Sequence, residues 1–117
     1  MSRSDHRALE SHLRVLLVHL LKWRYQPAGH QTGHSWADSI REARAQVADG
    51  LQTHPGIHQH MPAILVRAWR TARRVASRQT GLPLATFPLT CPWTMAQLLD
   101  RDYWPETTPP CDPQKLA

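Results

Sequence analysis

Four arginines in the second half of the chain are spaced to lie on one side of a helix. Arg67, Arg70, Arg74 and Arg78 follow one another at steps of three, four and four residues, and neighbours on a helix surface recur at those steps. The stripe lies opposite an apolar arc of the same segment. Like charges at this spacing repel one another, so an acidic partner would stabilise them. That partner could be a phosphate backbone, an acidic helix or water, which makes the stripe a candidate surface for a protein or for nucleic acid.

Three histidines form the best metal candidate that the spacing suggests. His54 and His58 share a face if the intervening turn is helical, and zinc accepts ligands at that spacing. However, a Pro-Gly pair disturbs this turn, His60 would point away from His58 on a helix, and no cysteine or carboxylate lies nearby in the sequence. We therefore favour a solvated helix start over a metal site, and we expect no cofactor.

His19 stands alone in an otherwise apolar run, residues 15–21. It could serve as a general base or a ligand, because a buried imidazole must be neutral or find a partner. The alternative is a core histidine bonded to a backbone carbonyl or a hydroxyl. We favour this second interpretation.

Cys91 precedes a proline, and no Cys-x-x-Cys pattern is present. A redox or nucleophilic role would need a lowered thiol pKa and a nearby base. We favour a small buried apolar residue instead. The second cysteine, Cys111, could be a free thiol or could pair between chains.

The large aromatic residues offer a further alternative. Interleaved with arginine they could stack on bases, but such residues more often fill gaps between helices. The sequence has no glycine-rich phosphate loop, no paired-carboxylate pattern and no Ser-His-Asp set that spacing can nominate. An enzyme is therefore the least supported class of protein, although the sequence leaves that question open.

Apolar periodicity predicts an all-α fold, an antiparallel bundle of three main helices with a proline-rich strap and a short C-terminal helix. The first helix should run from about residue 4 to Trp23 or Tyr25, and it is apolar on nearly every side. The second should begin at a capping box over residues 35–38. Its solvent-exposed face should carry Arg41, Glu42, Arg44, Gln46 and Asp49.

The third helix should begin near Pro55, unless Pro62 splits off a short turn before the main segment. Gly81 suits its left-handed cap. From residue 82 we expect an ordered, extended strap that lies over the core, and a second capping box over residues 94–97 should open the short helix. We expect one domain over residues 1–105 and a loose tail over residues 106–117.

The length and composition of the chain fit one folded domain. The chain has 117 residues and a net charge of +5 with the histidines neutral, and no apolar run is long enough to span a bilayer. The first ten residues are polar and charged, so we expect no signal peptide, no membrane association and a cytoplasmic location. A basic balance permits nucleic-acid or acidic partners without establishing either.

Four segments in order resemble a bacterial family of helical proteins, the domain-of-unknown-function family twenty-nine, which is common in cyanobacteria and proteobacteria. They are residues 19–27 (HLLKWRYQP), 35–41 (SWADSIR), 80–88 (TGLPLATFP) and 91–99 (CPWTMAQLL). The resemblance implies a compact helical fold and supplies no activity. The residues that carry the motifs are expected to be structural: His19, Trp23, Tyr25, Pro27, Ser35, Trp36, Ile40, Gly81, Phe87, Pro88, Cys91 and Pro92.

Members of this family usually carry some tens of residues before the point that matches Met1, including an acidic helix. Without them, only two long helices would cover an apolar first helix. We therefore expect the monomer to expose an apolar patch there, or to hide it by dimerising. The sequence favours a small protein that acts through protein–protein contacts, with itself or with another chain. The alternative is a nucleic-acid-binding module that uses the arginine stripe.

Overall fold

The computed structural model describes residues 3–25 and 34–105, and the side chains of residues 6–25 and 37–105. Several expectations concern parts of the chain outside these described residues: the tail over residues 106–117, Pro27, and the side chains of Ser35 and Trp36, including the Ser35 end of the capping box expected over residues 35–38. Over the described residues the chain is helical and has no strand, which confirms the predicted all-α bundle.

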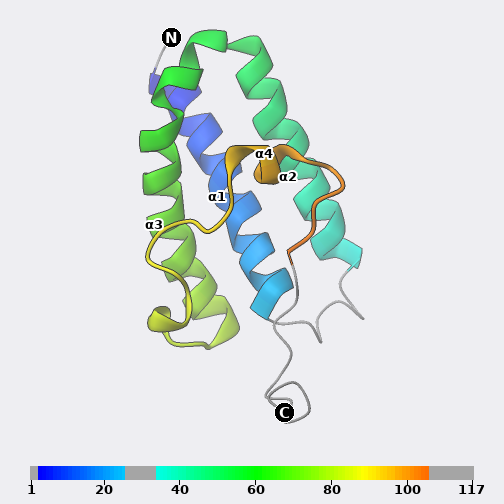
Figure 1. The fold of residues 1–117 in the computed structure, drawn as a ribbon, viewed down its shortest axis with the longest axis vertical. Coiled ribbons are helices and arrows are strands. Elements are labelled where there is room, and N and C mark those ends of the chain that lie inside the picture. The colour runs from blue at the N-terminus through cyan, green and yellow to red at the C-terminus, as the bar shows by residue number, and fades with distance from the viewer. Residues whose placement is uncertain (1–2, 26–33, 106–117) are drawn as a thin grey trace.

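Three long helices form the bundle (Figure 1): α1 (Arg3–Tyr25), α2 (His34–Thr53) and α3 (Met61–Thr80). Each runs opposite to the helix before it in the chain, and α1 lies between the other two. The contacts of α1 with α2 and with α3 account for most of the packing between helices. The apolar helix at the start of the chain is thus the central one, as its composition predicts.

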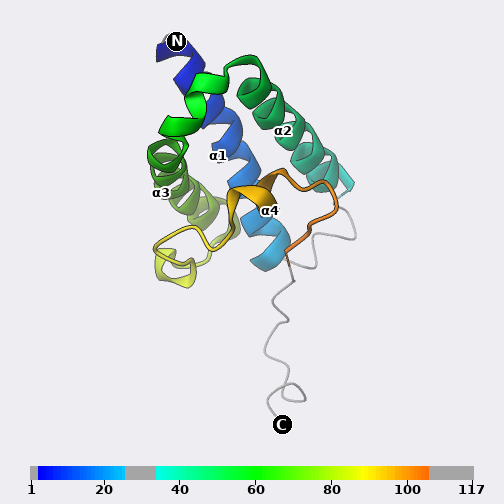
Figure 2. The same cartoon turned by 45° about the horizontal axis from the view of Figure 1, so that its top comes forward.

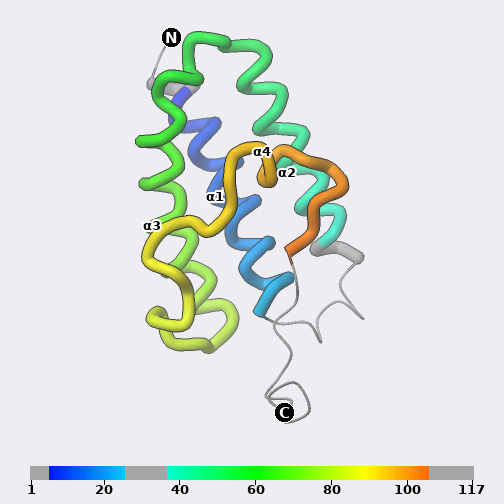
Figure 3. The backbone as a smooth tube through the Cα atoms, in the orientation of Figure 1, coloured from blue at the N-terminus to red at the C-terminus, as the bar shows by residue number. Residues whose placement is uncertain are grey.

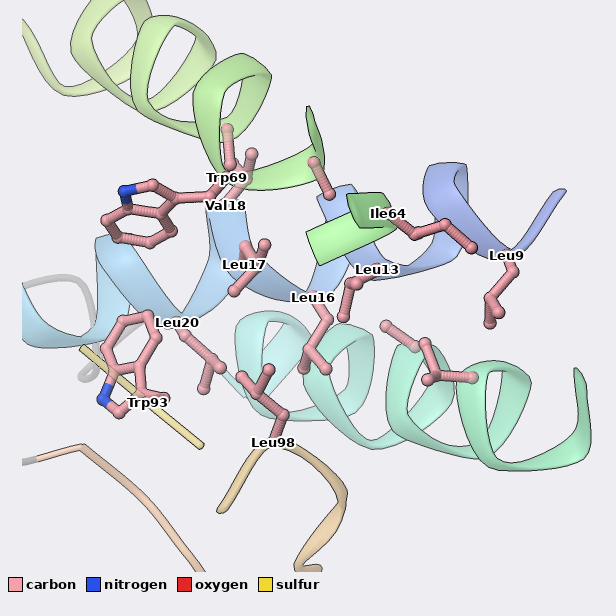
Figure 4. Packing of buried hydrophobic residues seen from close by; sticks show 14 of the residues in the cluster. Leu9, Leu13, Leu16, Leu17, Val18, Leu20, Ile64, Trp69, Trp93 and Leu98 are labelled. Carbon is pink, nitrogen blue, oxygen red and sulfur yellow. The ribbon is translucent and has the colours of Figure 1, made fainter. Parts of the chain in front are cut away.

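The core is built on α1, whose leucines are almost completely shielded from solvent (Figure 4). They occupy a stripe wide enough to contact α2 on one side and α3 on the other. The buried leucines are Leu9, Leu13, Leu16, Leu17, Leu20 and Leu21. Ile40 and Val47 of α2 and Ile64 and Ala68 of α3 complete this layer.

A short 3-10 helix, η2 (Pro55–His60), separates α2 from α3. The second of the two alternatives for the third helix is therefore correct, because α3 begins only at Met61, with Pro62 in its first turn. Proline is tolerated there since the first turn has no partner for its backbone N–H. At the other end Gly81 adopts φ 76°, the left-handed cap that the sequence predicts.

The strap, residues 82–105, crosses the bundle in front of α1 (Figures 1 and 3), and the tilted view in Figure 2 places it there too. It contains η3 (Leu84–Thr86) and the short helix α4 (Met95–Leu99). Thr94 and Gln97 form the predicted capping box, in which the Gln97 N–H donates to Thr94 Oγ1 at 3.1 Å. Phe87, Trp93 and Leu98 of the strap are buried in the core.

The strap changes where apolar surface is exposed. On the described part of α1 the exposed large apolar side chain is Val15, at 38%, because the strap lies over the face that α2 and α3 leave open. Among the described side chains, the other exposed large apolar ones are Val66 on α3 and Leu84 and Leu89 on the strap. We expected an apolar patch on α1, whereas the more exposed apolar side chains lie on α3 and the strap. No helix in the described chain is long and apolar enough to cross a membrane.

Candidate interaction surface on α3 and the strap

The four stripe arginines, here called the basic face of α3, are exposed and point away from the core. Arg67 forms an ion pair across to α1, with its Nε 2.8 Å from Glu10 Oε1. Among the described residues, Arg70, Arg74 and Arg78 have no ion-pair or hydrogen-bond partner. The structure therefore brings the four predicted residues together on one surface and neutralises one of them.

The largest excess of positive charge on any helix lies on α3, which carries five arginines and no carboxylate. Five of the fourteen Lys and Arg residues are on this helix, and the remaining nine are matched in number by the nine Asp and Glu residues. Residues 50–99 contain no Asp or Glu. The part of the fold made by η2, α3 and most of the strap thus carries no carboxylate side chain of its own to balance its arginines.

A groove of about 400 Å³ lies beside this face, between α3 and the strap. Its lining is mainly apolar: Leu65, Val66, Trp69, Arg70, Arg73, Leu89, Thr90 and Cys91. Val66 is 58% exposed and Leu89 is 83% exposed. We call this feature the α3–strap groove. Sequence reasoning missed it, because the contribution of Leu89 depends on where the strap passes α3.

Two side chains of α3 fix the wall of the groove. The Trp69 indole N–H donates to the carbonyl oxygen of Pro88 at 3.0 Å. Arg73 Nη2 donates to the carbonyl oxygens of Leu84 and Phe87, each at 3.1 Å. The strap is therefore held against α3 by three hydrogen bonds to backbone oxygens, and Arg73 is engaged in structure while Arg70 remains free.

Arg44 overturns one prediction about α2. The sequence pattern predicted that Arg44 lies on the solvent-exposed face, but Arg44 is only 3% exposed. Its Nε donates to the Leu98 carbonyl oxygen at 2.8 Å, and its Nη2 donates to the carbonyl oxygens of Gln97 and Tyr103 at 3.4 and 2.6 Å. The arginine thus supplies donors to backbone carbonyls in the last turn of α4 and just after it, where helix carbonyls lack intrahelical partners.

Burial lowers the pKa of the Arg44 guanidinium, and Asp100 and Tyr103 partly oppose this effect. The guanidinium also lies 5.5 Å from the centre of the Trp104 ring, within cation–π range. Arg44 thus has a structural role.

His19 is half-buried on α1, and its Nδ1 lies 2.8 Å from the Val15 carbonyl oxygen. His19 is therefore more exposed than the core histidine that we favoured, although its contact is with a backbone carbonyl, as that interpretation expects.

The three metal-candidate histidines do not converge. His58 and His60 are exposed, and the His60 ring lies 4.9 Å from the ring of His6, a residue that the sequence did not single out. Within the described residues, no group of three His, Cys, Asp or Glu side chains could hold a metal ion. The spacing of His54 and His58 was thus no guide to a cluster, because η2 interrupts the helix between them.

Cys91 is half-buried at the groove, and its thiol lies 3.5 Å from the Trp93 carbonyl oxygen, to which it donates. Burial raises the pKa of this thiol. A raised pKa leaves little thiolate at neutral pH, which is the opposite of what a nucleophile needs.

Aromatic pairs tie the strap to the helices. The Tyr25 and Phe87 rings meet edge-on with centroids 5.1 Å apart, and Trp69 and Trp93 meet likewise at 5.9 Å. The Trp23 ring lies 4.7 Å from that of Trp104. Pro92 is exposed beside these contacts. Because Trp69 and Trp93 are buried in this packing, their faces are not open for stacking on bases.

The fold and this surface define a small all-α protein whose distinctive feature is an unbalanced basic helix beside an apolar groove. Over residues 1–104 the sequence matches the family described as Domain of unknown function DUF29. The chain therefore belongs to this family, as its motifs indicated. It matches no curated protein and no solved structure.

Proposed function

We propose that this protein acts through protein–protein contacts and that the basic face of α3 is the contact surface for an acidic partner. The observation that carries the proposal is the group of five arginines on α3, within a stretch of the chain, residues 50–99, that has no carboxylate. Exposed charge of one sign steers a partner of opposite charge and selects against partners of like charge.

The partner is better sought in a different chain than in a second copy. Two copies that met through α3 would bring ten arginines together, since each helix carries five, and like charges across an interface cost several kcal/mol. A homodimer would need another face. Sedimentation across micromolar concentrations separates the two forms, because a homodimer shows a concentration-dependent mass.

Nucleic acid is the second candidate, since Arg70, Arg74 and Arg78 could contact phosphates. The burial of Trp69 and Trp93 argues against single-stranded binding by stacking. Duplex binding would depend on the arginines alone and should fall steeply with salt. A cytoplasmic location stays a prediction.

A photo-crosslinking residue at position 74, tested in the cells that naturally make the protein, examines both candidates. The proposal predicts a discrete adduct that protease removes and nuclease does not, and that Arg70→Glu with Arg78→Glu abolishes. The same residue at Ala45, an exposed position on α2, is the control. An adduct that nuclease removes would favour the nucleic-acid candidate, and equal labelling from both positions would refute a specific surface on α3.

A further inference from the structure

We infer that the α3–strap groove binds an acidic amphipathic helix of a partner protein, an inference that rests on the proposed function. The apolar side of that helix would cover Leu65, Val66 and Leu89, and carboxylates along its edge would pair with Arg70 and Arg74. The apolar half comes from α3 and the strap, and the charged half comes from α3 alone.

The apolar half begins with surface that the monomer leaves in water. Val66 and Leu89 come from different elements and are both more than half exposed, while Leu65 and Cys91, which also line the groove, are partly buried. Apolar side chains that gather around a hollow behave differently from apolar residues scattered singly over a surface. Covering them removes apolar area from water, which favours binding.

The charged half lies along one edge of the groove. Arg70 lines the groove, and Arg74 follows one helical turn later on the same face. Residues four apart on a helix are separated by about 6 Å along its axis. Acidic residues four apart on a partner helix repeat at the same distance, so a helix lying along α3 can present one carboxylate to each guanidinium.

The groove wall is already in place before anything binds. Arg73 and Trp69 hold the strap through the backbone oxygens of Leu84, Phe87 and Pro88. A preformed wall lowers the ordering cost of association. It also explains why Arg73, although basic, belongs to the wall and not to the charged edge.

Charge decides between the occupants that could cover an apolar groove. A second copy of this chain offers no suitable helix: α3 has no carboxylate, and Glu10 on the described part of α1 is paired with Arg67. Helix α2 does carry exposed carboxylates, but its apolar side is already buried in the monomer core and cannot also cover a groove. A phosphate backbone would match the arginines but would leave Val66 and Leu89 in water. An amphipathic helix with acidic edges satisfies both halves, in the manner of helix-in-groove recognition.

The test uses the full chain and a fluorescent synthetic helix of about 18 residues, roughly five turns, with leucines at helical spacing and glutamates along one edge. A matched peptide carries lysines in place of the glutamates. We expect the acidic peptide to bind at least about tenfold more tightly by fluorescence anisotropy at roughly 150 mM salt, where long-range charge effects are screened. Equal binding of the two peptides would overturn the inference.

Variants then separate the two halves of the site. Val66→Gln with Leu89→Gln removes apolar surface and leaves the charge unchanged, and we expect about tenfold weaker binding. Arg70→Gln with Arg74→Gln should weaken binding to a similar degree. The controls are Val15→Gln on α1 and Arg101→Gln after α4, both exposed and outside the groove, which should stay within about twofold. All of these sites are exposed, and circular dichroism verifies each fold.

The outcomes distinguish this inference from the proposed function. If only the arginine pair matters, the groove is not the docking site, while a protein contact through the basic face still stands. If duplex DNA displaces the peptide and binds the Val66→Gln, Leu89→Gln variant unchanged, nucleic acid is the ligand and the inference is wrong. Shifts of the Val66 methyl and Trp69 indole resonances on adding acidic peptide, with Val15 unmoved, would place it in the groove.

Discussion

Arg44 of α2 donates a hydrogen bond from its Nε to the carbonyl oxygen of Leu98 in α4, over 2.8 Å and 54 positions of the sequence. With the further bonds to Gln97 and Tyr103, a single guanidinium connects the central bundle to the end of the strap. A charge this well shielded is tolerated because three backbone oxygens replace the water it has lost.

We predict that Arg44→Ala lowers the free energy of unfolding by about 2 to 4 kcal/mol, because hydrogen bonds to a charged group are lost and carbonyls are left unsatisfied. Arg44→Lys should recover little, since an ammonium cannot reproduce the fork geometry. Urea unfolding measures both. The control is Arg41→Ala on the same helix, whose side chain is 64% exposed and paired with Asp38, and it should cost at most about 1 kcal/mol. Equal losses at the two positions would contradict this role for Arg44.

Neighbouring residues on α1 should respond very differently to truncation. Leu16 is fully buried, so Leu16→Ala should cost about 3 to 5 kcal/mol through lost transfer energy and the cavity left behind. Val15→Ala, one residue away at the exposed position, should change stability by no more than about 0.5 kcal/mol. Thermal or urea melts of the two variants provide the comparison. A large loss at Val15 would mean that α1 has a further cover in solution.

Gly81 is a position where backbone conformation alone sets the cost of substitution. A Cβ added there would meet no atom within 4 Å, and φ is +76°. Gly81→Ala should therefore destabilise the fold by roughly 1 to 2 kcal/mol, the penalty of the left-handed region for an L-residue. Gly81→Asn should cost less, because asparagine visits this region more readily. If both variants melted like the parent, the cap would have no energetic role.

The thiol of Cys91 should react slowly in the folded chain. Burial raises its pKa, so the thiolate fraction at any given pH near neutrality is smaller than in the unfolded chain. In a Cys111→Ser background, iodoacetamide labelling at pH 8 should be slower in the folded protein than in urea, and the rate should rise at higher pH than for an ordinary thiol. Faster labelling of the folded form would show an activated cysteine.

The raised pKa of the Cys91 thiol also determines how the stability of the fold changes with pH. Because the folded-state pKa is the higher one, the folded chain holds its proton where the unfolded chain loses it. The contribution to stability is present below the unfolded-state pKa and is lost as the pH rises through the folded-state pKa. Cys91→Ala should remove that loss in mildly alkaline urea titrations.

Sequence patterns within single helices and turns were sufficient to predict much of the fold. The continuous apolar character of α1 predicts a central helix, Gly81 predicts a left-handed cap, and Thr94 with Gln97 predicts the capping box of α4. The stripe spacing likewise predicts that Arg67, Arg70, Arg74 and Arg78 share one face. These features depend on residues within a turn or two of one another, and helical periodicity carries that information directly.

The tertiary structure decided the rest, and the strap is the reason. Residues 82–105 have no periodicity that reveals their path, so neither the burial of Arg44 nor the exposure of Leu89 follows from local pattern. By crossing α1 the strap covers the face that α2 and α3 leave open, and by passing α3 it forms the groove beside the basic face. Long-range contacts of this kind depend on which surfaces meet in space, which the order of residues along one segment does not record.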